Sequence, residues 1–228
     1  CSMDKRKYNR RILKLKIMAY RNTAITKDEQ DALTPMLVLQ DFINGNSRFT
    51  KGEAHTVDHK ALITQTTYGQ HPKAVVLSCI DSRVPVELIF DQTIGDVFVA
   101  RVAGNFENTD ILGSMEYSCK VAGSKLVLVL GHESCGAIKA ACDHVELGNI
   151  TAMLNNIQPA VKKSEEEITG EHNSSNKTFV DKTIENNVLL TMQRIREKSP
   201  ILKEMEAMGE IKIVGGVYHI SSGKVTMF

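Results

Sequence analysis

The fold is decided by the stretch LVLVLGHESCG at residues 126–136. Its first five residues are consecutive and apolar, which predicts a strand buried on both faces, as in a parallel sheet. Gly131 is expected to end this strand, and a helix is expected from about Cys135 to Val145. The segment that joins strand to helix therefore presents His132 and Cys135, three positions apart.

The stretch AVVLSCIDSR at residues 74–83 has the same organisation. Its apolar, β-branched start predicts a buried strand that ends at Cys79, and Pro85 is expected to open a short helix through Phe90. Functional residues of parallel α/β sheets lie beyond the carboxyl ends of strands. If these two strands are neighbours, Cys79 and His132 meet at one end of the sheet.

Alternating strands and helices extend outward from these two stretches. The further expected elements are a helix from Thr34 to Gly45, irregular chain at 46–72, a strand at 97–102, a helix from Asn108 or Thr109 to about Val121, mostly helical chain at 151–208 with a loop at 170–176, a strand at 211–220 and an edge strand at 225–228. This order predicts an α/β fold: a mainly parallel central sheet of four strands plus an antiparallel edge strand, flanked by helices, with an N-terminal helical arm.

The length and charge of the chain fit one domain with a basic extension. Residues 1–22 carry eight Lys or Arg and one acid, whereas the rest carries 20 basic and 26 acidic residues. We expect a basic arm at 1–33, packed on an acidic subunit or solvated, and a single catalytic domain at 34–228. No apolar run approaches the roughly 20 residues of a membrane helix, and no signal-peptide core is present, so no membrane span and a cytoplasmic location are expected. A processed or targeted precursor stays open as the alternative, because the sequence starts at Cys1.

Cys79, His132 and Cys135 form a candidate metal-ligand set. Two thiolates and one imidazole suit zinc, and three protein ligands leave a fourth position open for catalysis. An H-x-x-C pair alone is a weak signal, and a cysteine at a strand end is ordinarily a small buried apolar residue. The odd count of five cysteines argues against a disulfide scaffold.

Three motifs together resemble the signature of β-class carbonic anhydrases: Cys79-x-Asp81-Ser82-Arg83, the run RVAGN at residues 101–105, and Gly131-His132-x-x-Cys135-Gly136. The resemblance is dense over residues 34–162 and looser over the last strands. It implies one zinc ion per subunit on the Cys-His-Cys set, an Asp81–Arg83 dyad, and a homodimer or homotetramer. The implied activity is the reversible hydration of carbon dioxide to bicarbonate and a proton by zinc-bound hydroxide.

The Asp81–Arg83 dyad has a physical rationale at such a site. Two thiolates and a neutral imidazole cancel the charge of Zn²⁺, so its water is acidified less than at a three-histidine site. Asp81, two residues from Cys79, is expected to orient the hydroxide by accepting its hydrogen bond. Arg83 is expected to hold Asp81 ionised and turned away from the metal through a bidentate pair. The alternative is an ordinary structural ion pair.

Further substrate-binding residues follow from the resemblance, position by position. Gln70 is expected to hydrogen-bond the substrate, and the backbone N–H of Gly136 to receive a bicarbonate oxygen. Phe98 and Tyr117 are expected to line a narrow apolar pocket, with Ala103 also at the substrate site. A loop glutamine and plain core aromatics are the competing interpretations.

One position departs from some members of the family, which bind bicarbonate at a second, inhibitory site built on a Trp. That position is Val76 here, the chain contains no Trp, and Arg101 lacks this partner. We therefore expect Asp81 to stay off the metal near neutral pH, without that bicarbonate switch.

Three other functions remain open on the sequence. A sister hydrolase acting on carbonyl sulfide or carbon disulfide would use the same ligands. A zinc-stabilised binding protein would need Asp81 as a permanent fourth ligand, against which Arg83 argues. A nucleic-acid binder would use the basic arm, but no recognised module accompanies it. The expected partners are therefore a small-molecule substrate and further copies of the chain, not nucleic acid.

Overall fold

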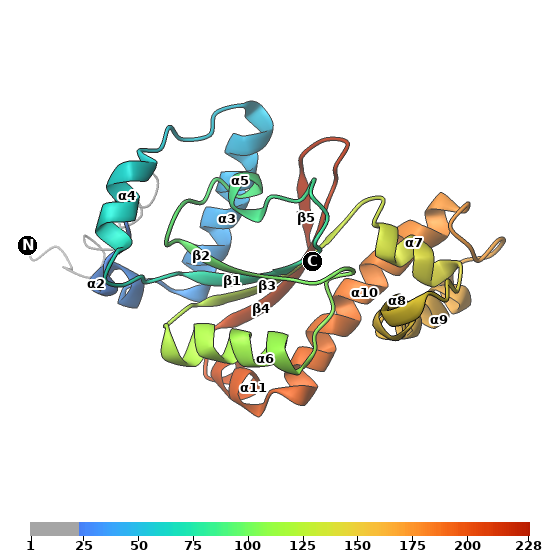
Figure 1. The fold of residues 1–228 in the computed structure, drawn as a ribbon. Helices are drawn as coiled ribbons and strands as arrows, with labels where there is room; N and C mark the ends of the chain where they lie inside the picture. Colours follow the sequence, from blue (N-terminus) through green and yellow to red (C-terminus); the bar gives the residue numbers. More distant parts are fainter. Residues whose placement is uncertain (1–22) are drawn as a thin grey trace, which may run out of the picture.

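A five-stranded sheet forms the centre of the protein (Figure 1). The structure is a computed structural model that describes residues 23–228, so the basic cluster noted at 1–22 lies outside the described residues. In order across the sheet, the strands are β2 (Val97–Arg101), β1 (Ala74–Ser78), β3 (Leu126–His132), β4 (Lys212–Tyr218) and β5 (Val225–Met227). The first four are parallel and β5 pairs antiparallel with β4, which confirms the predicted α/β sheet.

Helices cover both faces of this sheet. They are α2 (Lys27–Asp31), α3 (Pro35–Lys51), α4 (His59–Thr66), α5 (Val86–Ile89), α6 (Thr109–Glu116), α7 (Gly136–Cys142), α8 (Gly148–Leu154), α9 (Gln158–Glu167), α10 (Lys177–Lys198) and α11 (Pro200–Ala207), with a π-helical turn, η1 (Tyr117–Val121), continuing α6. In Figure 1, α3, α4 and α5 lie on one side of the sheet and α6 and α11 on the other, while α7, α8 and α9 gather beside one end of α10.

Alternate residues of each strand enter opposite cores, because successive side chains point to opposite faces. In β1, Val76 belongs to the core that contains Phe42 of α3, whereas Val75 belongs to the core that contains Met115 of α6 and Val188 of α10. Every residue of β1 and β3 is buried. Burial on both faces accounts for the uninterrupted apolar runs that predict these two strands.

Two glycines predicted to end elements instead lie inside them. Helix α3 continues past Gly45, where an added Cβ would lie 1.9 Å from the backbone oxygen of Phe90. Strand β3 continues through Gly131, where an added Cβ would lie 2.7 Å from the side chain of Val188 on α10. Both predicted ends are therefore wrong, because these glycines serve close packing between elements and not chain termination.

The interval 46–72, predicted to be irregular, contains the end of α3 and all of α4. Asp58 caps α4 by accepting a hydrogen bond from the backbone N–H of Ala61. Leu62 is the only buried residue in this helix, so no apolar stripe marks it in the sequence.

The described part of the predicted arm packs on the domain. Gln30 of α2 is fully buried, and its side-chain amide donates to the backbone oxygens of Pro72 at 2.7 Å and Ala122 at 2.8 Å. The boundary at residue 34 stays a prediction. None of the helices within residues 23–228 has both the length and the apolar character of a membrane span.

Candidate metal centre

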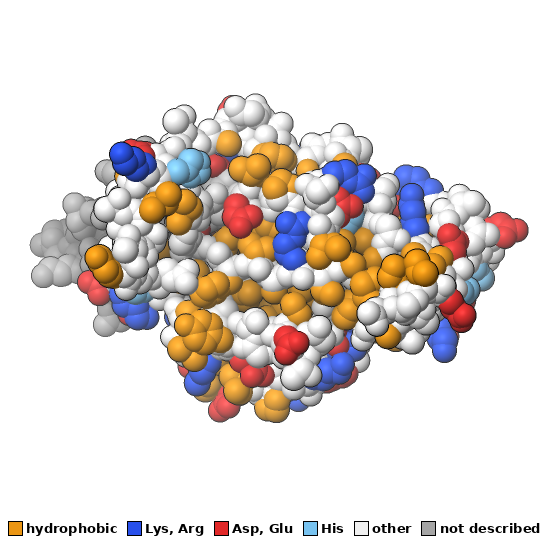
Figure 2. All heavy atoms as spheres, viewed as in Figure 1, with side chains coloured by type: hydrophobic (Ala, Val, Ile, Leu, Met, Phe, Trp, Pro, Cys, Tyr) orange, Lys and Arg blue, Asp and Glu red, His pale blue; other side chains and the backbone are white. Residues whose placement is uncertain are grey.

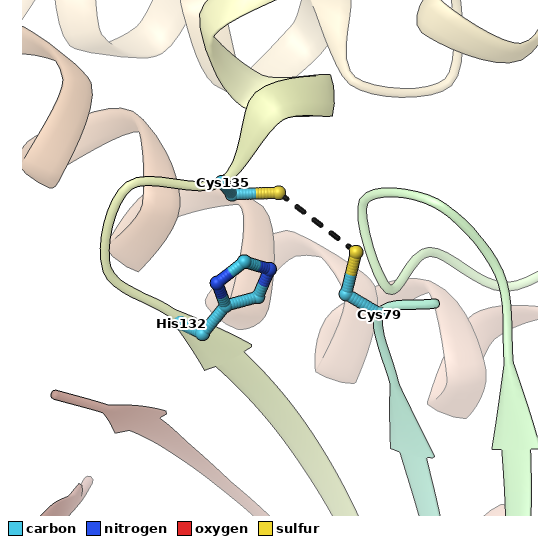
Figure 3. Close-up of side chains that lie close together, drawn as sticks. All are labelled: Cys79, His132 and Cys135. Carbon is cyan, nitrogen blue, oxygen red and sulfur yellow. Dashed lines mark hydrogen bonds between the residues drawn. The ribbon is translucent and has the colours of Figure 1, made fainter. Parts of the chain in front are cut away.

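The chain segments at the carboxyl ends of β1 and β3 bring three metal-ligating side chains together (Figure 3). Strand β1 pairs with β3, so Cys79 after β1 and His132 at the end of β3 are neighbours, and Cys135 precedes α7. The three ligand atoms lie within 4.8 Å of one another, and the two sulfurs are 4.0 Å apart. All three residues are buried. The predicted convergence of these residues is therefore confirmed.

The geometry of this metal cluster, defined as Cys79, His132 and Cys135, fits a zinc ion. Tetrahedral zinc with Zn–S bonds of about 2.3 Å separates two sulfurs by about 3.8 Å. Nδ1 of His132 lies 2.9 Å from the backbone oxygen of Glu133, so Nδ1 carries the proton and leaves Nε2 as the ligand atom. Nε2 is buried without a hydrogen-bond partner in the described chain, and a metal ion would satisfy it.

One of the two sulfurs already favours the thiolate form. The hydrogen bond from the Cys135 thiol lowers the pKa of Cys79, and the backbone N–H groups of Gly104 and Asp81 also lower it. The same pairing with Cys79, together with burial, raises the pKa of Cys135. A divalent cation between the sulfurs would favour both thiolates, because a coordinating thiol is deprotonated.

Asp81 and Arg83 form the predicted pair beside the metal cluster. Nε of Arg83 donates to Oδ1 of Asp81 at 3.0 Å and Nη2 donates to Oδ2 at 2.7 Å, so the pair is bidentate. The Arg83 guanidinium, and then the Arg83 backbone N–H, lower the pKa of Asp81 to about 2. Oδ2 lies 3.9 Å from Nε2 of His132. A carboxylate that is ionised at neutral pH thus lies next to the ligands.

Arg101 braces the same segment from the end of β2. Its Nε donates to the backbone oxygen of Cys79 at 2.9 Å, and its Nη2 to that of Asp81 at 2.7 Å. Val76 is fully buried within β1. Arg101 therefore has a structural role of its own, and the missing bicarbonate switch stays a prediction.

The turn after β2 and the start of α7 border the metal cluster. Ala103 precedes Gly104, whose backbone N–H donates to Sγ of Cys79 at 3.4 Å. Gly136 opens α7 directly after Cys135, and an added Cβ there would meet nothing within 4 Å. The positions of Ala103 and Gly136 fit the predicted substrate site, and the space at Gly136 is open.

Three predicted substrate-binding residues lie away from the metal cluster of their own chain. Gln70 precedes β1, at the amino-terminal end of the strand. Phe98 pairs with Val75, four residues before Cys79, or about 13 Å along the strand. The rings of Phe98 and Tyr117 are 6.3 Å apart, and the hollow that they line contains no metal ligand. Within a single chain, Gln70, Phe98 and Tyr117 therefore do not reach the metal cluster.

The residues that support the ligands from outside are not found by sequence reasoning. The Glu133 carboxylate lies 3.3 Å from Nδ1 of His219 and accepts hydrogen bonds from the backbone N–H and hydroxyl of Ser221. These contacts tie the segment after β3 to the β4–β5 hairpin. Asn187 of α10 donates to the backbone oxygen of Gly104. The position of Glu133 directly after the predicted ligand His132 is a signal that could have marked it as a supporting residue. No sequence pattern marks Asn187.

Known proteins are similar to this chain in both sequence and fold. The profile of the family described as carbonic anhydrase matches residues 74–225. Carbonic anhydrase 2 of Mycobacterium tuberculosis is 33% identical over 202 residues, which cover 85% of this chain and 92% of that protein. The carbonic anhydrase of Pseudomonas aeruginosa is 29% identical over 195 residues, covering 82% and 86%.

A solved structure agrees with these relatives. The β-carbonic anhydrase of Coccomyxa, in complex with acetazolamide, has a TM-score of 0.66 at 26% identity, covering 74% of this chain and 77% of that one. The matched profile spans the metal cluster and the Asp81–Arg83 pair. Together, profile, relatives and fold show that this chain belongs to the carbonic anhydrase family, in its β class.

Proposed function

We propose that this protein catalyses the reversible hydration of carbon dioxide to bicarbonate and a proton, with zinc held by Cys79, His132 and Cys135. One observation carries the proposal: three buried ligand atoms lie within 4.8 Å of one another, beside the arginine-held carboxylate of Asp81. Membership of the β-carbonic anhydrase family supports the same reaction.

The charge of the ligand set determines how strongly a bound zinc ion would lower the pKa of water. Zinc bound there would act as a Lewis acid that lowers the pKa of water and so supplies a nucleophile. Because two thiolates neutralise the cation, this effect is weaker than with three histidines. The polar groups next to the ligands must therefore orient the nucleophile.

Asp81 is the proposed orienting group. With a pKa of about 2, its carboxylate is ionised at neutral pH and only accepts hydrogen bonds. By accepting a hydrogen bond from the nucleophile, Asp81 would fix which lone pair faces the carbon of the substrate. Arg83 holds both carboxylate oxygens, which keeps Asp81 from turning onto the metal. A closed, purely structural zinc site would require this pair to break.

The substrate-binding half of the site is proposed to need a second copy of the chain. Gln70 and Tyr117 are exposed, and β2 is the outer strand of the sheet on this side. Figure 2 shows hydrophobic side chains gathered in a band across this face. A homodimer that covers the face would bury this apolar surface and bring Gln70, Phe98 and Tyr117 toward the partner's metal cluster.

Zinc analysis combined with stopped-flow hydration of the full-length protein tests the proposal. We expect one zinc per subunit and carbon dioxide hydration that disappears when zinc is removed. A zinc-loaded protein that turns over carbonyl sulfide or carbon disulfide, and not carbon dioxide, would identify the sister hydrolase instead. A protein that binds no zinc, or that is inactive on all three substrates, would overturn the proposal.

A further inference from the structure

The segment 102–107, between β2 and α6, donates a backbone hydrogen bond to the metal cluster. Gly104 donates its N–H to Sγ of Cys79 at 3.4 Å, inside the protein. Its φ of +85° lies in the left-handed region, and an added Cβ would lie 2.5 Å from the side chain of Ile157. The position therefore strongly favours glycine, and glycine restrains its own peptide groups less than any other residue. Something outside the segment must fix the direction of this N–H.

Helix α10 holds this segment at two places. Near its middle, Nδ2 of Asn187 donates to the backbone oxygen of Gly104 at 2.8 Å. Toward its end, Nε of Arg194 lies 2.9 Å from both carboxylate oxygens of Glu107, and Nζ of Lys198 donates to one of them at 2.8 Å. Glu107 is buried, so this ion cluster anchors the far end of the segment. Of these two attachments, only that of Asn187 is made at Gly104, the residue that hydrogen-bonds the metal ligand Cys79.

Burying the side-chain amide of Asn187 costs folding free energy, because only part of its hydrogen-bonding capacity is used. Asn187 is 1% exposed, and its Oδ1 has no hydrogen-bond partner among residues 23–228. A buried polar atom without a partner costs free energy, and an apolar side chain of similar shape would avoid that cost. In the described part of the chain, the one hydrogen bond that Asn187 makes through Nδ2 is the contact with Gly104. What the amide provides is therefore the orientation of Gly104.

We infer that Asn187 is a positioning residue for the metal centre: its side-chain amide fixes Gly104 so that the Gly104 N–H donates to the ligand sulfur of Cys79. The inference rests on the proposed zinc site. A hydrogen bond to the thiolate stabilises the anionic form that binds metal, and loss of such outer-shell partners typically weakens metal binding by about 10–100-fold. Asn187 acts on the metal only through Gly104 and does not touch substrate.

The neighbouring residue provides a matched control. Asn186 lies on the same helix and is equally buried at 1%, but its Nδ2 donates to Ser164 at 3.0 Å and Glu167 at 2.9 Å on α9. Asn187→Leu and Asn186→Leu each remove one buried amide donor while keeping the number and branching of the side-chain heavy atoms, so both add the same bulk. The full-length proteins are titrated with a chromophoric zinc chelator, and their cobalt(II) forms are examined for the thiolate-to-metal charge-transfer band.

We expect Asn187→Leu to hold zinc about tenfold less tightly and to shift the cobalt–thiolate band. Asn186→Leu should keep both the affinity and the band of the wild type, even where its thermal stability falls. Equal zinc affinities and bands in the two variants would overturn the inference. If Asn187→Leu does not fold, Asn187→Asp keeps the shape and replaces the donor by an acceptor; unchanged zinc affinity in that variant overturns the inference equally. A wild type that binds no zinc would instead refute the proposed function.

Discussion

The metal cluster and the aromatic hollow, lined by Val75, Phe98 and Tyr117, are both built on β1 but differ in completeness. At the metal cluster the ligands are buried, Arg101 and Gly104 of the same chain donate hydrogen bonds to Cys79, and Arg83 holds the adjacent Asp81. At the aromatic hollow, Tyr117 is 57% exposed, and no metal ligand is within the lining.

This difference separates two tasks of one active site. A metal ion requires ligand atoms held within a few tenths of an ångström, which a single chain achieves through its own supporting hydrogen bonds. A small apolar substrate requires apolar walls, which packing against another subunit can supply. Under the proposed function, the protein completes its metal-binding half within the chain and leaves the substrate-binding half to assembly with a second copy, a contrast that the following predictions test.

Loss of a metal ligand should have the largest effect. In Cys135→Ser a hard hydroxyl replaces a soft thiolate, so we expect zinc content below about a tenth of wild type and hydration lowered more than about 10³-fold. Zinc analysis and stopped-flow assays measure both. Cys142→Ser is the matched control, because this buried cysteine of α7 contacts Thr183 and not the cluster. Retention of zinc by Cys135→Ser would mean that the chain does not complete the site as described.

Asp81→Asn should abolish most turnover while zinc stays bound. The substitution keeps the size of the side chain but removes the ionised acceptor, so kcat/KM should fall by about 10²–10³-fold. Asp143→Asn is the control, since that carboxylate accepts a hydrogen bond from Ser174 on the surface. Zinc analysis is run beside the kinetic assay. Simultaneous loss of zinc and activity would assign Asp81 to metal retention instead of orientation.

Mixed oligomers test whether the substrate half comes from a second copy. Chains carrying Gln70→Ala and chains carrying Asp81→Asn are co-expressed with different tags, and the mixed oligomer is purified. If Gln70 acts in the partner's site, one of two mixed sites regains both wild-type residues, so about half of wild-type activity should return. Activity that only equals the mean of the two parent variants would mean that Gln70 and Asp81 act in the same chain, or that Gln70 does not act at all.

The metal cluster is predictable from the sequence because signals at two strand ends combine with the family resemblance of three motifs. Residues 74–83 and 126–136 each combine a doubly buried strand with ligands at the strand's end, and adjacent parallel strands carry those ends to one place. The pairing of β1 with β3 meets the condition on which the predicted convergence depended. The Asp81–Arg83 pair, which the family resemblance implies, forms between residues only two positions apart.

What sequence reasoning misses depends on partners far along the chain or in another chain. Glycine is typical of the ends of helices and strands, which is why Gly45 and Gly131 are predicted as ends. Both lie inside their elements because Phe90 and Val188 pack too closely for a larger residue. Asn187 has its partner 83 residues away. A match of Gln70 or Phe98 to a family position likewise does not say in which subunit's site the residue acts.

Two glycine substitutions give a smaller effect and compare a close helix contact inside the domain with the open side of the aromatic hollow. Gly45→Ala places a Cβ against the backbone at Phe90, directly after α5, and should destabilise the protein by about 1–3 kcal/mol. Gly113→Ala lies on α6 beside the aromatic hollow, where an added Cβ meets nothing within 4 Å. Removing that helical glycine should stabilise by about 0.5–1 kcal/mol. Chemical unfolding measures both, and equal values would mean that the contact at Gly45 and the surroundings of Gly113 are packed alike.

The smallest expected effect concerns pH: the ratio of the hydration rates of wild type and Asp81→Asn should not change across the neutral range. Asp81 has a pKa of about 2, below its ordinary 3.8, so its pairing with Arg83 stabilises the fold fully above about pH 4 and is lost only as the pH falls toward 2. The hydration rate of wild type divided by that of Asp81→Asn should therefore stay constant from about pH 6 to 9, because other titrating groups affect both proteins. Stopped-flow assays at matched pH measure the ratio. A ratio that falls as the pH drops through this range would show that Arg83 does not keep Asp81 ionised during turnover, and the metal-binding half would then be no more complete within one chain than the aromatic hollow.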